Sequence, residues 1–266
     1  MSKSRVYIDS LTAKGKISFT VKQYCDAVKV SYKAAINSFE HLRQNSEIVS
    51  PSKGYYLILP PEFRQQGCLP AEYFIDDLMR HWNMDYYVCM LSAALYHGAA
   101  HHQPQMFQVM LNNKKENIKC GHIVIEFVQN STAADTPTLQ LKTRTGFFKV
   151  STPEATAMDM LKYIRQSGGI GRIATVLDEL TESMSADALS QLAAQSKEKA
   201  WIHRLGFILD KLGHDGLAES LYRILDKNRV NIIPLVPYTS ITGATRDKKW
   251  HIAINANIES DIHDTE

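Results

Sequence analysis

The sequence lacks several features that would place it in a specialised class. Its four cysteines, Cys25, Cys68, Cys89 and Cys120, form no C-x-x-C pair, so neither a zinc ribbon nor a thioredoxin-type site is expected. Four cysteines in 266 residues do not make a disulfide scaffold, and free thiols in a reducing cytoplasm are the simpler expectation. No apolar run reaches the about 20 residues of a membrane span, and no signal peptide is visible behind Met1. These absences predict a soluble cytoplasmic protein.

A large net charge is absent too, but the charge is unevenly distributed. The chain has 30 Lys and Arg against 28 Asp and Glu, which gives +2. Residues 1–54 hold nine basic and four acidic residues, or +5, and the rest of the chain therefore carries −3. A basic unit on a mildly acidic body points to a polyanion as the partner of the basic unit.

The N-terminal residues predict three helices followed by a β-hairpin. The first helix is expected at 5–13, the second from its capping residue Thr20 to about residue 28, and the third from Ser31 to about residue 44. β-prone runs on both sides of a Pro/Gly turn then predict a hairpin that ends at residue 59. In the third helix, the spacing of three apolar residues predicts a buried face that consists of Ala35, Phe39 and Leu42.

This order of elements is typical of a winged helix-turn-helix domain, which we predict for residues 1–59. The third helix would enter the major groove of DNA and present Tyr32, Lys33 and Asn37 to base edges. Helix N-termini and lysines would hold phosphates. The candidate DNA-binding residues are Lys16, Thr20, Lys22, Ser31, Tyr32, Lys33, Asn37, Arg43, Ser52 and Lys53. The same pattern also fits a small helical domain that packs on another protein.

Chain breakers at 60–61 and 67–70 predict a linker over residues 60–69 and a second domain over 70–266. The whole chain is therefore expected to be α/β (α+β): a winged helix-turn-helix, then a larger mixed α/β domain with a helical C-terminal part. The elements expected in the second domain are helices at 70–82 and 85–97, strands at 106–111, 122–128, 138–143 and 147–150, a helix at 153–166, broken helices from 171 to about 228, and an extended run at 250–254.

Two patterns in the second domain suggest a metal or phosphate site only weakly. His97, His101, His102 and His122 could include zinc ligands, but a polar hinge explains them as well. The Gly-rich residues 168–171 lack the spacing of a phosphate loop and fit a helix C-terminus. Neither pattern predicts a metal or cofactor site.

A strand with the sequence Gln140-Leu141-Lys142 is similar to the acidic-x-Lys strand of metal-dependent nucleases. Glu126 or Asp135 would be the upstream carboxylate, but Gln140 stands where those enzymes have an acid. A helix that contains Trp201 and Phe207 fits core packing. A winged-helix-targeted nuclease or nucleotide-processing enzyme and a protein-interaction module therefore remain the alternatives to a DNA-binding regulator.

Several segments resemble one known family, in order and over nearly the whole chain. The longest is YYVCMLSAALYHGAAHHQPQ at 86–105, followed by FQV at 107–109. The others are GYYLILPPEFR at 54–64, YFIDDLM at 73–79, TGFFKVSTPEAT at 145–156, SGGI at 167–170 and RLGFIL at 204–209. These residues resemble the AbiEi family of antitoxins, the regulatory half of abortive-infection type IV toxin–antitoxin pairs.

The resemblance implies a non-enzymatic antitoxin and transcriptional autorepressor involved in phage defence. The winged helix would bind double-stranded operator DNA upstream of the operon, and the larger domain would counteract a nucleotidyltransferase toxin encoded next to it. A stable complex with that toxin is not required, and a monomer that binds DNA cooperatively fits the resemblance. It transfers no catalytic residues, cofactor or metal.

Overall fold

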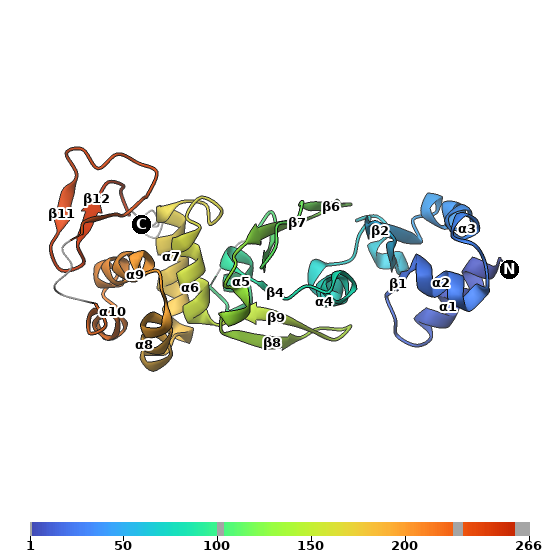
Figure 1. Cartoon of the computed structure of the whole chain (residues 1–266), viewed down its shortest axis with the longest axis horizontal. Coiled ribbons are helices and arrows are strands. Elements are labelled where there is room, and N and C mark those ends of the chain that lie inside the picture. Colours follow the sequence, from blue (N-terminus) through green and yellow to red (C-terminus); the bar gives the residue numbers. More distant parts are fainter. Residues whose placement is uncertain (1, 100–103, 226–230, 259–266) are drawn as a thin grey trace, which may run out of the picture. The chain divides into compact units, whose positions relative to one another are not determined.

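The structure, a computed structural model, describes residues 2–99, 104–225 and 231–258 (Figure 1). The chain divides into two compact units, Met1–Val88 with Gln105–Val150 and Cys89–Pro104 with Ser151–Glu266. Both units mix helices and strands, so the predicted α/β fold class is confirmed. Among the described residues, no helix is both long and apolar enough to cross a membrane. The predicted linker at residues 60–69 and the domains on its two sides stay predictions.

The first unit begins with the predicted helices and hairpin. These elements are α1 (Lys3–Thr12), β1 (Ser18–Thr20), α2 (Val21–Val28), α3 (Tyr32–Gln44), β2 (Ile48–Ser52) and β3 (Tyr55–Ile58). The hairpin strands pair antiparallel, and β1 adds to β3, giving the strand order β1-β3-β2. β1 was not predicted, because three residues are too few to show the alternation that marks a strand.

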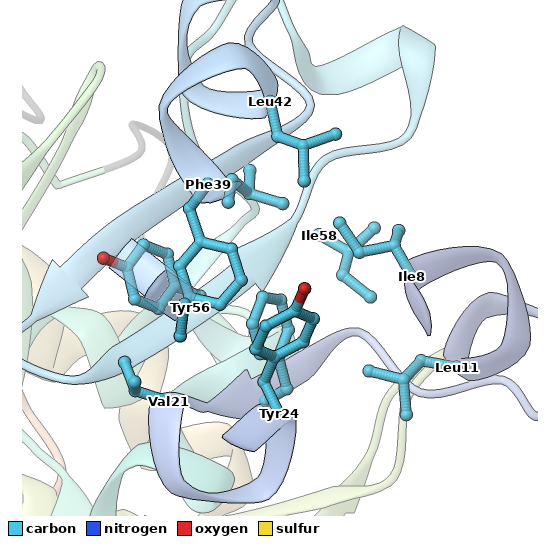
Figure 2. Close-up of a cluster of buried hydrophobic side chains, with 11 residues drawn as sticks. Ile8, Leu11, Val21, Tyr24, Phe39, Leu42, Tyr56 and Ile58 are labelled. Atoms are coloured by element: carbon cyan, nitrogen blue, oxygen red, sulfur yellow. The ribbon is translucent and has the colours of Figure 1, made fainter. Parts of the chain in front are cut away.

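Aromatic side chains form the core of this N-terminal part (Figure 2). Phe39 from α3 lies with its ring centroid 4.8 Å from that of Tyr24 in α2 and 5.0 Å from that of Tyr56 in β3. Phe19 of β1 stacks on Tyr56 at 5.6 Å. Such pairs stabilise a core beyond the apolar area that they bury, so this cluster fixes how α3 sits on the sheet.

The rest of the first unit consists of α4 (Ala71–Trp82) and a six-stranded sheet. The strands are β4 (Tyr86–Val88), β5 (Phe107–Leu111), β6 (Ile118–Cys120), β7 (Ile123–Gln129), β8 (Thr138–Lys142) and β9 (Phe147–Ser151), with 3-10 turns at Pro61–Phe63 and Ala133–Asp135. Their order is β6-β7-β5-β4-β9-β8. The sheet is mixed, because β5 pairs parallel with β7 and antiparallel with β4. The four predicted strands are confirmed within one residue, and β6 is an additional strand.

The predicted helix from Asp85 to His97 is wrong in its first half. Residues Tyr86–Val88 form strand β4 in the middle of the sheet, and the helix begins only at Met90. All three residues of β4 are buried. A segment that is apolar on every side shows no periodicity to separate a strand from a helix, whereas two tyrosines and a valine favour a strand.

The second unit is mainly helical. Its helices are α5 (Met90–Tyr96), α6 (Pro153–Lys162), α7 (Ile170–Leu180), α8 (Ala186–Gln195), α9 (Ala200–Lys211) and α10 (Asp215–Tyr222), with a 3-10 turn at Thr181–Ser183. Thr152 caps α6 as its sequence predicts, but α6 ends at Lys162 rather than near Gln166. The Gly168-Gly169 pair therefore lies in the turn to α7, not at the end of α6.

A small sheet completes the second unit. It consists of β10 (Ile233–Pro234), β11 (Thr245–Asp247) and β12 (Ile252–Ile254), in the order β10-β12-β11. The predicted extended run at 250–254 contains β12. Trp250, which is fully buried, packs directly over Gly206 of α9, and its indole N–H donates to Asp210 at 2.6 Å. This contact ties the small sheet to the helices.

Candidate nucleic-acid interface

Helix α3 has one buried face and one exposed face. Ser31 begins the helix, and its hydroxyl accepts a hydrogen bond from the Ala34 N–H at 3.3 Å. Ala35, Phe39 and Leu42 are buried, as their spacing predicts. The opposite face presents the exposed Lys33 and Asn37, whereas Tyr32, which is 55% exposed, lies in the first turn on the side of Ala35 and Phe39. These three side chains are available to a ligand that lies along the helix.

The start of α2 is fixed by a complete capping box. The hydroxyl of Thr20 accepts from Gln23 N–H at 3.1 Å, and the Gln23 side-chain oxygen accepts from Thr20 N–H at 2.8 Å. The hydroxyls of Thr20 and Ser31 accept from backbone N–H groups, so each keeps its own O–H to donate to a phosphate, beside the free N–H groups of the first turns.

The hairpin turn projects a single lysine. Lys53 is exposed, and Gly54 after it has φ = +77°, a left-handed conformation that glycine adopts at little cost. The hydroxyl of Ser50 donates to the Ser52 carbonyl oxygen at 2.8 Å or to the Tyr55 carbonyl oxygen at 3.0 Å. These bonds shape the turn that carries the exposed Lys53.

Trp82 is a neighbour of the hairpin that sequence reasoning missed. Its indole N–H donates to the Ser52 hydroxyl at 3.2 Å. Lys115, from the loop between β5 and β6, places its ammonium 4.5 Å from the centre of the same indole ring. Ser52 is therefore held by the protein itself, and Lys115 brings a further cation to this part of the surface. No spacing rule connects residues 30 positions apart, so only the fold could find this contact.

The basic candidates differ in how their charges are balanced. Lys16, Lys22, Lys33 and Lys53 are all exposed, and within the described ranges no ion pair involves any of them. Arg43 instead has Glu40 as a partner, with a nitrogen–oxygen distance of 3.7 Å. The lysines keep their full charge for an external anion, whereas part of the Arg43 charge is balanced.

A buried tyrosine lies behind this surface. Burial raises the pKa of Tyr56, and the positive charge of Arg43 opposes that rise. The Tyr56 hydroxyl therefore stays neutral near pH 7.

The nuclease-like residues do not come together. Gln140 and Lys142 lie on β8 and are exposed, whereas Glu126 lies on β7 and accepts from the Gln108 amide at 3.0 Å. Three strands separate β7 from β8 in the sheet, which corresponds to about 19 Å at the usual strand spacing. This arrangement forms no joint site for a magnesium ion.

The histidines show no metal site in the described part of the chain. No group of three or more potential ligands occurs there. The His97 ring nitrogen Nε2 hydrogen-bonds to the Ser151 carbonyl oxygen at 2.7 Å. His101 and His102 lie outside the described residues.

A comparison with known protein families finds a match for the sheet and for helices that follow it. Residues 86–211 match the family model described as the AbiEi antitoxin C-terminal domain. This part of the chain is similar to the C-terminal domain of AbiEi antitoxins. The match supports a type IV antitoxin role, and an antitoxin implies a toxin partner. The AbiEi match begins after α4, so the candidate DNA-binding residues lie outside it.

A crystal structure of the RV2827C protein from Mycobacterium tuberculosis is similar in fold. The TM-score is 0.69 at 16% sequence identity, and the similarity covers 94% of this chain and 90% of that one. At this identity the likeness concerns the fold alone. None of the curated proteins matches the sequence.

Proposed function

We propose that the chain is a type IV antitoxin that also represses its own operon by binding operator DNA. Residues 1–59 would be the winged helix-turn-helix that binds DNA, and the part that matches the AbiEi family would counteract a nucleotidyltransferase toxin. The exposed face of α3 with Lys33 and Asn37, beside the exposed Tyr32, is the observation that carries the DNA-binding proposal.

The chemistry of that face suits base edges. An α-helix fits the major groove of B-DNA, and asparagine can form two hydrogen bonds with adenine. Asn37 lies one turn along α3 from Lys33, so both side chains would meet the same stretch of groove. The 13-residue helix is about 20 Å long, which is sufficient to span the groove.

The lysines around α3 would position the protein on the phosphates. Lys22 lies in the first turn of α2, Lys16 lies before β1, and Lys53 lies at the hairpin turn. Phosphate contacts supply affinity but little sequence information, and they make binding dependent on salt. We therefore assign specificity to α3 and non-specific affinity to these lysines.

The direct test is binding to the DNA just upstream of the gene, compared with a scrambled duplex at several salt concentrations. We expect a preference of about a thousandfold or more for the upstream DNA. Equal binding to both duplexes with a steep salt dependence would leave only phosphate contacts and would contradict repression at a specific operator. Weak binding to both would favour the interaction-module alternative.

Variants separate the two kinds of contact. Replacing Lys33 and Asn37 together with alanine should reduce the preference for the upstream duplex by about 100-fold, since each base contact contributes about 1–3 kcal/mol. Lys53→Ala should weaken both duplexes equally and lower the salt slope by about 0.9. Lys197→Ala removes an equally exposed charge from the second unit and should change neither. An unchanged operator preference in the double variant would contradict the assignment of α3.

Antitoxin activity should survive the same double variant. The AbiEi match starts at residue 86, so the loss of Lys33 and Asn37 leaves the matched part intact. We expect cells that express the neighbouring toxin to be rescued equally by the double variant and by the unchanged chain, from a promoter that the protein does not control. Loss of rescue by a correctly folded double variant would show that neutralisation needs DNA binding.

A further inference from the structure

Two of the four cysteines lie side by side in the first unit. Cys68 belongs to the segment between the hairpin and α4, and Cys120 is the last residue of β6. The two segments touch through their backbones, because His122 N–H donates to the Gln66 carbonyl oxygen at 3.0 Å. A Cβ on Gly121 would lie only 2.2 Å from that oxygen. The absence of a side chain at Gly121 therefore permits the approach that brings the cysteines together.

The side chains of Cys68 and Cys120 lie where these two segments meet. Cys120 Sγ lies 4.0 Å from the carbonyl oxygen of Gly67, the residue directly before Cys68. Cys68 is 0% exposed and Cys120 is 4% exposed. Both are free thiols in the structure. The fold thus holds two reduced sulfur atoms together that are far apart in the sequence.

The contact makes the two thiols unequal. The hydrogen bond with Cys120, reinforced by burial, raises the pKa of Cys68. The same hydrogen bond lowers the pKa of Cys120. Cys68 therefore keeps its proton, and Cys120 is the sulfur that ionises first. A thiolate is the nucleophilic form of cysteine, so Cys120 is the sulfur that an oxidant meets.

We propose that Cys68 and Cys120 form a redox-convertible pair, which a small peroxide oxidises to an intramolecular disulfide. The Cys120 thiolate attacks one peroxide oxygen, the O–O bond breaks, and a sulfenic acid forms while hydroxide leaves and takes up a proton. The Cys68 sulfur then attacks the sulfenic sulfur, and the S–S bond forms as water leaves with the Cys68 proton. Two thiols lose two electrons, and hydrogen peroxide becomes two waters.

This proposal is independent of DNA binding and of the toxin. It concerns the attachment of the segment after the hairpin to β6, a strand that also packs beside hairpin strand β2. A disulfide would turn that attachment from a packing contact into a covalent bond. A small oxidant is required, because the pair is almost completely buried.

The test uses the full-length reduced protein and one equivalent of hydrogen peroxide, followed by denaturation and trapping of the free thiols with N-ethylmaleimide. Relative to the reduced protein, we expect the oxidised protein to lose two hydrogen atoms and to carry two fewer maleimide groups. Treatment with dithiothreitol before the trapping step should reverse both changes. Trypsin should then release a cross-linked pair of peptides, Gln65–Arg80 and Cys120–Lys142.

Cysteine variants provide the controls. Cys25→Ser and Cys89→Ser should still form the cross-link, whereas Cys120→Ser should not, with circular dichroism confirming that each variant is folded. The proposal is overturned if peroxide leaves maleimide on both Cys68 and Cys120 while it oxidises Cys25 or Cys89. Oxidation of Cys120 to a sulfinic acid without any cross-link overturns it as well. The peptide map of the unchanged chain decides the question even if a variant fails to fold.

Discussion

Gly206 is a residue at which a single added methyl group should have a large structural effect. A Cβ at this position in α9 would lie 2.0 Å from the ring of the fully buried Trp250. Both partners are packed in the interior, so neither can move without disturbing its neighbours. Gly206→Ala should lower the free energy of unfolding by about 1–3 kcal/mol or more, measured by urea denaturation.

Gly216 provides the matched control, since it is also a helical glycine. In α10 a Cβ at Gly216 meets nothing within 4 Å. Gly216→Ala should therefore stabilise the protein by about 0.4–1 kcal/mol, because alanine restricts the unfolded chain. Equal effects of the two substitutions would contradict the packing of Trp250 on α9.

For single residues, the sequence predicts which side chains of α3 are exposed, but it does not predict which side chains hydrogen-bond to one another. Helical spacing separates Lys33 and Asn37 from the buried Phe39, because a helix repeats every 3.6 residues. Nothing local shows that Ser52 accepts from Trp82, since that bond depends on how α4 packs beside the hairpin. Candidate residues on a helix face could thus be chosen from sequence, whereas those on the hairpin needed the fold.

Among the elements, α2 depends most clearly on its cap. Thr20 and Gln23 satisfy two N–H groups at the helix start, and α2 has only eight residues. Thr20→Ala should lower the free energy of unfolding by about 1 kcal/mol, whereas Thr20→Ser keeps a hydroxyl and should cost much less. Amide hydrogen exchange in α2 would locate the loss, and unchanged exchange in Thr20→Ala would contradict the capping role.

Helices and strands could be predicted from the sequence where the residues that determine them are close together in the chain. The caps Thr20, Ser31 and Thr152 act within three residues, and their helices begin where the sequence indicates. Strand β4 was mistaken for helix because its burial on all sides comes from neighbouring strands. Short β6 was missed for the same reason, since its identity as a strand depends on pairing with β7.

For the whole molecule, the central question is how many residues the N-terminal part needs in order to fold by itself. The buried residues of its core cluster lie between Ile8 and Ile58 (Figure 2). The opposite side of β3 packs toward α4 instead, where Tyr55 stacks on His81 at 5.4 Å. The Ser18 hydroxyl also donates to Asp77 at 2.8 Å. A boundary placed at the chain breakers alone overlooks these contacts.

Two fragments of the chain make this a measurable prediction. A fragment of residues 1–59 should fold, because its own core is complete, but it leaves the buried Tyr55 and Leu57 without the cover of α4. A fragment of residues 1–83 restores that cover and should need a clearly higher urea concentration to unfold. Each fully buried large apolar side chain contributes about 1.5–3 kcal/mol, so the difference should exceed the error of the measurement. Equal midpoints would mean that α4 adds nothing to the N-terminal part and would favour a boundary at residue 59, whereas an unfolded shorter fragment would make α4 an essential part of the proposed DNA-binding unit.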